Sequence, residues 1–314
     1  MYSTHLQQTN DESGIAGASE AILVTGATGN VGHAVVEALL SAGMTVRAAG
    51  RDRDAVSKMF GDRVEPVSLD FTDPSTWTTA FSGVRQMFLL RPPQLGKPKK
   101  QMLPALEFAR GQGVEQIVFL SLQGAEKNKV VPHAAIESWL RTSGISWTFV
   151  RASFFHQNLS TTHLTDIRDR NELVVPAGRG ATAFVDAKDV GAVAAAALVD
   201  SHTYFNKALT VTGDEALTYA RIAQILTAEL GRPIRYAQPG AIRYALHARR
   251  RLAMPWGMVL VTLAIYTTAR LGVADGLTRT VRDVLGRDPI RFDQFAHRER
   301  EHWAAQPRLG RSHR

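Results

Sequence analysis

The sequence predicts an α/β protein with a doubly wound parallel sheet, followed by a smaller and mostly helical C-terminal part. Three observations lead to this fold class. Between residues 21 and 121, short apolar runs alternate with helical patterns about every 20 to 30 residues. The first apolar run leads through a glycine-rich turn directly into a helical pattern. From residue 241 onward the pattern is helical, with breaks at Pro255 and at residues 272–276.

The glycine-rich turn joins residues 21–24, an apolar run typical of a buried parallel strand, to the helical pattern of residues 33–40. A strand, a glycine turn and a helix in this order place backbone N–H groups and a helix N-terminus against a pyrophosphate. The glycines serve the tight turn, the approach of the phosphates and the packing of helix on strand. The turn therefore predicts a dinucleotide site of the Rossmann type. The cofactor contacts expected here are Gly26, Thr28, Gly29, Asn30, Val31 and Gly32.

The second strand, predicted at residues 45–49, is followed by a charged segment that begins at Arg51. In NAD-selective sites an acidic side chain at this place accepts hydrogen bonds from the ribose 2′-hydroxyl. A guanidinium instead suits a 2′-phosphate by its charge and its two-point geometry. Arg51 therefore favours NADP(H), while Asp52 keeps NAD(H) open as the alternative.

The next three strands are predicted at residues 64–70, 86–90 and 116–121. Ligands of a doubly wound sheet bind beyond the carboxyl ends of its strands. Asp70 and Phe71 end the third strand where an adenine ring would lie, although Asp70 is also interpreted as the neighbour of a helix N-cap. The other cofactor contacts expected at these strand ends are Leu90, Arg91, Pro92 and Ser121.

Composition limits the chemistry that the chain can carry. The chain has 314 residues, of which 45% are apolar and 21% charged, as is typical of a globular protein. Because it has no cysteine, disulfides, thiolate catalysis and Cys-ligated metals are excluded, and the reducing cytoplasm is the expected compartment. The scattered histidines show no metal-binding spacing, so no metal is expected.

The net charge of +8 is concentrated near the C-terminus, where residues 232–314 carry 16 Arg against 6 Asp and Glu. No aromatic-interleaved basic stripe accompanies them, so nucleic acid is not an expected partner. The strongest apolar stretch, residues 256–269, is too short for a membrane span. We expect it to form a buried helix. Arg249, Arg250 and Arg251 directly before it leave contact with a membrane surface as an alternative.

The Tyr-x-x-x-Lys pair of the common short-chain dehydrogenases is missing, because no tyrosine lies between Tyr2 and Tyr204. In that pair the tyrosine is the general acid and the lysine lowers its pKa. In this chain Pro132 instead opens a helix that carries His133 and Glu137 one turn apart on one face. His133 can donate or relay a proton near neutral pH, and Glu137 can orient it or raise its pKa. The alternative for His133 is a capping bond at the helix start.

The His-x-x-x-Glu helix at residues 133–137 and the Phe-Phe-His-Gln-Asn segment at residues 154–158 resemble the NmrA-like family of atypical short-chain dehydrogenases/reductases. The likeness continues through residues 184–190, 217–223 and 281–303, so it covers nearly all of the chain from residue 21 to 303. It implies an extended Rossmann fold that binds NAD(P)H.

The resemblance also implies what the protein does. Relatives include reductases of quinones, azo dyes and triphenylmethane dyes, and isoflavone-reductase-like enzymes in which a lysine acts at the place of His133. His133 is therefore expected to face the nicotinamide and the substrate. Other relatives bind the dinucleotide without known chemistry and serve as redox-sensing regulators.

The pocket walls are expected directly after the strand that ends near Val150, where nicotinamide and substrate meet. An extended backbone lets only one of two adjacent aromatic residues face the pocket. The expected substrate contacts are Ser153, Phe154, Phe155, Gln157 and Asn158.

These assignments predict the domain organisation. Residues 1–19 are a disordered extension, and residues 20–155 form the NAD(P)-binding Rossmann domain, to whose sheet residues 180–212 return. The substrate-binding subdomain comprises residues 156–179 and 213–305, and a flexible tail covers residues 306–314.

Two functions remain open at this point. The first is an NAD(P)H-dependent oxidoreductase that reduces a conjugated small molecule, of the quinone, azo dye or enone type, by hydride transfer, with His133 and Glu137 as candidate catalytic residues. Such acceptors demand stacking and exclusion of water more than a strong acid. The alternative is a non-catalytic NADP(H)-sensing regulator with a protein partner, which the missing Tyr–Lys pair permits.

Overall fold

A seven-stranded parallel sheet forms the centre of the protein. The computed structural model describes residues 20–304, so the extension and tail predicted at residues 1–19 and 306–314 lie outside the described residues. The strand order is β10-β6-β5-β4-β1-β2-β3. Because the order turns back at β1 and β4, the sheet is doubly wound, as the sequence predicts. In chain order its strands are β1 (Ile22–Thr25), β2 (Val46–Gly50), β3 (Glu65–Ser68), β4 (Gln86–Leu90), β5 (Gln116–Leu122), β6 (Ser146–Ala152) and β10 (Lys207–Val211).

Helices cover both faces of the sheet, which is why its central strands are largely apolar and buried. All four residues of β1 are buried. One face is covered by α1 (Asn30–Ser41), α2 (Arg53–Phe60), α8 (Ala187–Val199) and α13 (Thr280–Leu285). The other face is covered by α3 (Trp77–Phe81), α4 (Pro98–Gln101), α5 (Leu103–Gly111) and α6 (Pro132–Thr142).

A second lobe follows beyond the carboxyl ends of the strands and has a hydrophobic core of its own. It contains a three-stranded sheet in the order β11-β9-β7 and a two-stranded sheet of β12 and β8. Its strands are β7 (Phe154–Phe155), β8 (Glu172–Val174), β9 (Ala181–Val185), β11 (Ala216–Thr218) and β12 (Arg235–Ala237). Its helices are α7 (Leu164–Arg170), α10 (Tyr219–Leu230), α11 (Ala241–Arg250), α12 (Trp256–Arg270) and α14 (Phe292–Glu299).

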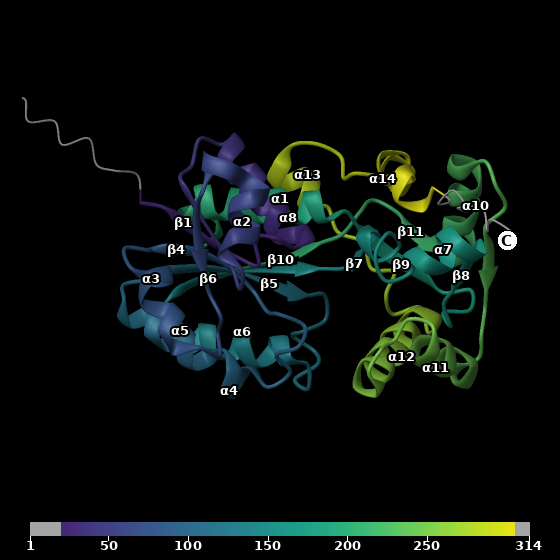
Figure 1. Cartoon of the computed structure of the whole chain (residues 1–314), viewed down its shortest axis with the longest axis horizontal. Coiled ribbons are helices and arrows are strands. Elements are labelled where there is room, and N and C mark those ends of the chain that lie inside the picture. The colour runs from purple at the N-terminus through teal and green to yellow at the C-terminus, as the bar shows by residue number, and fades with distance from the viewer. Residues whose placement is uncertain (1–19, 305–314) are drawn as a thin grey trace, which may run out of the picture.

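The C-terminal segment ties the two lobes together. After α13 on the sheet, the chain runs to α14 on the second lobe (Figure 1). On the way the backbone N–H of Ile290 donates to the buried Asp189 of α8 at 2.7 Å, and Arg287 pairs with the same carboxylate at 2.7 Å. This end of the chain therefore belongs to both lobes.

The prediction that residues 256–269 form a buried helix is right about the helix and wrong about its burial. The stretch forms α12, but only Val259, Tyr266 and Ala269 are buried, and Trp256 keeps 56% of its surface exposed. Apolar composition alone cannot show whether the rest of the chain supplies a cover for every side of a helix. Among residues 20–304, no helix combines the length and the apolar character that crossing a membrane requires.

Candidate functional site

The glycine turn brings the chain from β1 into α1 with almost no space for side chains. Gly26 has φ +65°, a conformation that favours glycine. A Cβ atom on Gly32 would lie 2.1 Å from the carbonyl oxygen of Gly26, so this position also requires glycine. Thr25 accepts a hydrogen bond from the backbone N–H of Leu90 at 2.8 Å, which ties the turn to the end of β4.

The N-terminus of α1 has no capping side chain and no acidic residue in its first turn. Its first N–H groups therefore point outward without an intrahelical partner, an arrangement that suits an anion. A cavity of about 620 Å³ opens beside it and is lined by Thr28, Gly29 and Asn30. Lys188, at the start of α8, lies on the wall of the same cavity. Val31 instead turns its side chain into the core.

At the end of β2, the side chain of Arg51 is available to a ligand, whereas that of Asp52 is already hydrogen-bonded within the protein. Arg51 is exposed. Asp52 caps α2, and its Oδ1 accepts hydrogen bonds from the N–H groups of Asp54 at 2.9 Å and Ala55 at 3.2 Å. The sequence analysis did not identify α2, although the capping aspartate is a signal that could have indicated it.

At the end of β3, Asp70 and Phe71 are largely engaged within the protein. Asp70 accepts from the N–H of Thr72 at 2.8 Å and from its hydroxyl at 2.7 Å, and these bonds lower the pKa of the carboxyl group. The structure thus realises a local, turn-forming role for Asp70. Phe71 is buried in the core under the sheet, so its ring cannot stack freely on an adenine.

At the end of β4, Arg91 folds back onto the turn that follows it. Its Nη1 donates to the carbonyl oxygens of Pro92, Pro93 and Leu95 at 3.0–3.2 Å. Its Nε is buried without a partner, and burial lowers the pKa of the guanidinium. Arg91 is therefore a fixed positive charge on the wall of the site, with one donor left over.

His133, in the first turn of α6, is a neutral histidine. Its pKa is lowered to about 4, first by burial and then by the positive charge of Arg91. Glu137 acts in the opposite direction, but its effect is the smallest of the three. Glu137 therefore raises the pKa of His133 as expected, but burial and Arg91 outweigh it and the pKa stays below its usual range. The imidazole lies 5.9 Å from the ring of Phe119, and its Nδ1 is buried without a hydrogen-bond partner.

Glu137 has other partners than His133. Its Oε1 accepts from the hydroxyl of Ser121 at 2.7 Å and from Nε of Arg151 at 3.0 Å, and its Oε2 accepts from Nη2 of Arg151 at 2.7 Å. All three residues are buried. Because Ser121 donates its only proton to Glu137, its oxygen can act toward any other group only as an acceptor.

Arg151 is the residue of this group that the sequence analysis missed. It joins β6 to α6 through Glu137, and it reaches Glu126, in the loop between β5 and α6, at 3.1 Å. An arginine at the end of an otherwise apolar strand must find an acidic partner if it is buried. This requirement, together with the acidic Glu137 on the neighbouring helix, was the sequence signal from which the pair could have been predicted.

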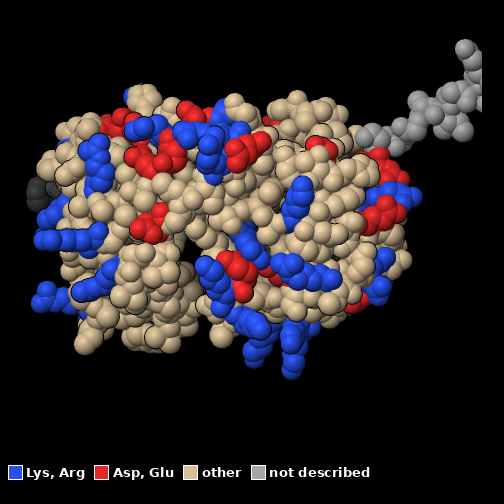
Figure 2. Space-filling view, turned by 180° about the vertical axis from the view of Figure 1, so that it is seen from behind, with Lys and Arg blue, Asp and Glu red and all other residues tan. Residues whose placement is uncertain are grey.

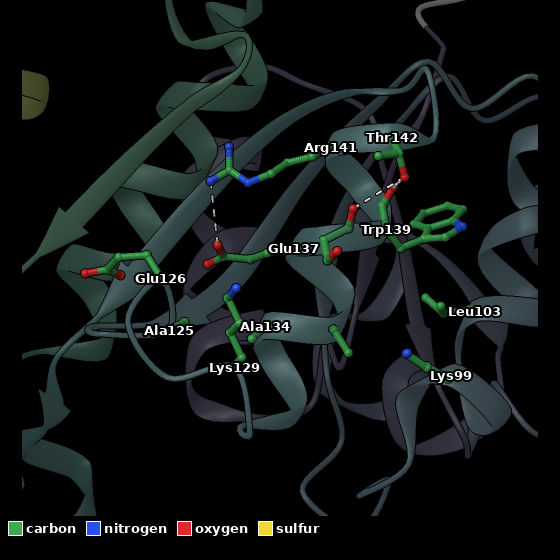
Figure 3. Close-up of a pocket in the computed structure, with 12 residues that line it drawn as sticks. Lys99, Leu103, Ala125, Glu126, Lys129, Ala134, Glu137, Trp139, Arg141 and Thr142 are labelled. Atoms are coloured by element: carbon green, nitrogen blue, oxygen red, sulfur yellow. Dashed lines mark hydrogen bonds and ion pairs between the residues drawn. The ribbon is translucent and has the colours of Figure 1, made fainter.

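The far side of α6 borders a groove of about 650 Å³ (Figure 3). Figure 3 shows Glu137 pointing toward Arg141, with Glu126 and Lys129 on the adjacent loop. Arg141 lies 3.8 Å from Glu137 and 4.5 Å from the ring centre of Trp147. Glu137 lines the groove but His133 does not, so Glu137 is the residue that the groove shares with the candidate site.

The segment after β6 divides its side chains between the site and the two cores. Ser153 is buried and its hydroxyl has no partner. Phe154 packs on the core of the second lobe, where it meets Phe184 at 6.1 Å, whereas Phe155 packs on the core of the sheet. Both rings stay half-buried. This alternation is what an extended backbone imposes.

Gln157 serves the fold through both of its amide atoms. Its Nε2 donates to Asp186 at 3.0 Å, and its Oε1 accepts from the N–H of Ala187 at 3.0 Å. Asp186, fully buried, also accepts from Arg298 at 2.6 Å, and hydrogen bonds hold the pKa of its carboxyl group far below the usual range. These contacts favour a structural role for Gln157 over the expected contact with substrate. Asn158 follows it, half-buried.

The residues present are suited to a dinucleotide. Eight side-chain polar atoms in the described part of the chain are buried without a hydrogen-bond partner, and three of them, Arg91 Nε, His133 Nδ1 and Ser153 Oγ, belong to the segments that follow β4, β5 and β6. Buried polar groups normally find partners, so three orphans in one region indicate a missing polar ligand. The uncapped N-terminus of α1 and the glycine turn add a region suited to the pyrophosphate of a dinucleotide. Among residues 20–304 no group of His, Cys, Asp and Glu could hold a metal ion.

Comparisons with known proteins agree with this geometry. The chain is 33% identical over 283 residues to the NAD(P)H azoreductase of Xenophilus azovorans, which covers 88% of this chain and 96% of that protein. The fold is similar to that of the triphenylmethane reductase of Citrobacter sp. complexed with NADP(H), with TM-score 0.76, 23% identity, and 88% and 99% coverage of the two chains. It is also similar to the NADPH-dependent quinone oxidoreductase of Escherichia coli complexed with NADPH, with TM-score 0.79, 22% identity, and 88% and 99% coverage.

The family itself is shown by the sequence match. Residues 18–257 match the model of the NmrA-like family. That match includes the glycine turn, the His-x-x-x-Glu helix and the Phe-Phe segment on which the resemblance was based. The chain belongs to the NmrA-like family.

Proposed function

We propose that this protein reduces a conjugated small molecule, such as a quinone, an azo compound or an enone, by hydride transfer from NADPH. It is an NAD(P)H-dependent reductase. The observation that carries the proposal is the state of His133, a neutral and unpartnered imidazole in a site whose described residues include no Tyr–Lys pair. The named activities of the azoreductase, dye reductase and quinone oxidoreductase relatives support the same class of acceptor.

The chain's own residues define how such a cofactor is bound. The first turn of α1, close to Gly29 and Asn30, would hold the pyrophosphate on its free N–H groups. Arg91 and Ser153 each offer a buried polar atom without a partner, and Ser121 offers an acceptor oxygen. When bound, NADPH supplies the hydride, which this protein's side chains cannot.

His133 polarises the acceptor rather than protonating it. With a pKa of about 4, the imidazole carries one ring proton at neutral pH and can donate it in a hydrogen bond, but it holds no second proton to transfer. An acceptor with an electron-poor π system tolerates this, because its reduced form takes a proton from water. A ketone or sugar substrate would require the stronger acid that the missing tyrosine supplies in other enzymes.

NADPH is favoured over NADH by the end of β2. Arg51 is exposed there and suits a 2′-phosphate, whereas the carboxylate of Asp52 already caps α2. The absence of cysteine suits work in the reducing cytoplasm.

The test is a titration of the purified protein with NADPH and NADH by calorimetry, followed by NADPH oxidation with quinones, azo dyes and enones. We expect micromolar or tighter binding of NADPH and turnover of at least one acceptor. The Gly32→Ala variant serves as the control without a working site. Binding without turnover on any acceptor would refute the reductase and favour the redox sensor. No binding of either nucleotide would refute both.

A further inference from the structure

One apolar surface of the protein is left without a cover. Helix α12 is apolar around most of its circumference, yet it buries only one side. Leu260, Val261 and Ile265 are 65%, 51% and 37% exposed, and with Trp256 they lie on the side away from the core. A helix that is apolar on all sides is normally buried against something.

Helix α11 extends this surface and adds charge to it. The two helices lie side by side at the edge of the second lobe (Figure 1). Helix α11 exposes Ile242, at 79%, and Leu246, at 41%. The same exposed side carries Arg243, Arg249 and Arg250. We call this surface the α11–α12 face; its members are Ile242, Leu246, Trp256, Leu260, Val261, Ile265, Arg243, Arg249, Arg250 and Arg251.

This combination is confined to one part of the protein. Within residues 20–304, ten of the thirteen exposed large apolar residues lie between Ile242 and Leu277. Residues 241–279 also contain six arginines and only one acidic residue, Asp275. From behind, the lobe at the lower left of Figure 2 is mostly tan with Lys and Arg along its outer edge. Scattered exposed apolar residues need no explanation, but a large contiguous group of them marks an interaction site.

We propose that the α11–α12 face docks onto the surface of an anionic lipid bilayer. Apolar side chains of this kind enter the boundary between headgroups and acyl chains, and the arginines pair with lipid phosphates. With 15 residues, α12 is about 22 Å long, shorter than the hydrocarbon core, so it lies along the interface and does not cross it.

The charge of the face selects this occupant over two others. In a symmetric dimer each face meets its own copy, which brings the arginine clusters of both copies together without acidic partners. Nucleic acid would satisfy the arginines but leave Trp256, Leu260 and Val261 in water. An anionic bilayer offers apolar and negatively charged partners at once.

The test is flotation of the full-length protein with two kinds of vesicle. One consists of phosphatidylcholine alone, and the other also contains about 30 mol% phosphatidylglycerol, which makes its surface negative. We expect binding only to the anionic vesicles, weakened by salt. The variants Leu260→Ser/Ile265→Ser and Arg249→Gln/Arg250→Gln/Arg251→Gln should each lower the bound fraction at least about fivefold. NADPH binding by both variants should remain unchanged, which shows that they fold.

The matched control is Lys97→Gln/Lys99→Gln/Lys100→Gln, which removes three charges from exposed positions around α4, on the sheet lobe. It should bind vesicles like the wild type. Equal loss in this control would mean attraction by net charge alone and would overturn the proposal. So would absence of vesicle binding, or a dimer in sedimentation that Leu260→Ser/Ile265→Ser converts to monomer.

Discussion

The buried guanidinium of Arg151 donates two hydrogen bonds to the buried carboxylate of Glu137, from Nε to Oε1 at 3.0 Å and from Nη2 to Oε2 at 2.7 Å. This pair joins α6, which carries His133, to β6, whose end leads into the site. The same carboxylate receives the proton of the Ser121 hydroxyl. The carboxylate of Glu137 therefore ties α6 to the ends of β5 and β6, next to the place where the acceptor is proposed to bind.

Removing one member of this pair should be costly. Arg151→Met leaves the buried carboxylate of Glu137 with only the partly exposed Arg141, 3.8 Å away, as a cationic partner, so we expect a loss of about 3–5 kcal/mol in the free energy of unfolding, measured by urea denaturation. Arg151→Met/Glu137→Leu should recover part of the loss. Arg110→Met, which removes an exposed pair with Glu107, should cost less than about 0.5 kcal/mol. Equal losses for Arg151→Met and Arg110→Met would contradict the importance of the buried pair.

The low pKa of His133 should appear in the acid stability of the protein. Because its pKa is about 4 in the folded protein and about 6.5 when unfolded, the unfolded chain binds more protons below pH 6.5. The stability linked to the neutral state of His133 is therefore fully present above pH 6.5 and is lost as the pH falls toward 4. His133→Asn should lose less stability than the wild type between pH 7 and 4.5, as measured by urea denaturation at both values. Identical losses would show that His133 is not a buried neutral histidine.

The same property predicts the pH dependence of catalysis. If His133 donates a hydrogen bond without transferring a proton, kcat/KM should show no ionisation of His133 between pH 5.5 and 8. His133→Asn, which keeps a donor, should follow a parallel profile at a lower rate. A step near pH 6.5 that disappears in His133→Asn would instead establish proton transfer.

Gly32→Ala should damage cofactor binding. The added methyl group would lie 2.1 Å from the carbonyl oxygen of Gly26, so the turn has to move. We expect the Kd for NADPH, measured by calorimetry, to rise at least about tenfold. Gly111→Ala adds the same methyl group where no atom lies within 4 Å and should leave the Kd unchanged.

Arg51→Gln should change the choice of nucleotide. Loss of a charge-assisted contact with the 2′-phosphate should raise the Kd for NADPH about tenfold and leave that for NADH within about twofold. Arg53→Gln, whose Nε donates to the Pro66 carbonyl oxygen, is the neighbouring control and should spare both nucleotides. An equal rise for NADPH and NADH in Arg51→Gln would mean that Arg51 does not read the 2′-phosphate.

The fold class and the family could be predicted from the sequence without the structure. The glycine turn and β4, at Gln86–Leu90, could be predicted because their signals are local. Glycine spacing and apolar runs act on the backbone within a few residues, so no distant part of the chain is needed to interpret them.

Which charges meet and which surfaces stay exposed depends on how distant parts of the chain pack together. Glu137 pairs with Arg151 and not with His133, and Gln157 binds Asp186, 29 positions later. Ionic and hydrogen-bond partners are selected by the packing of separate elements, which the periodicity of each element does not contain. The exposure of α12 follows for the same reason, because burial depends on whether another part of the molecule covers the helix.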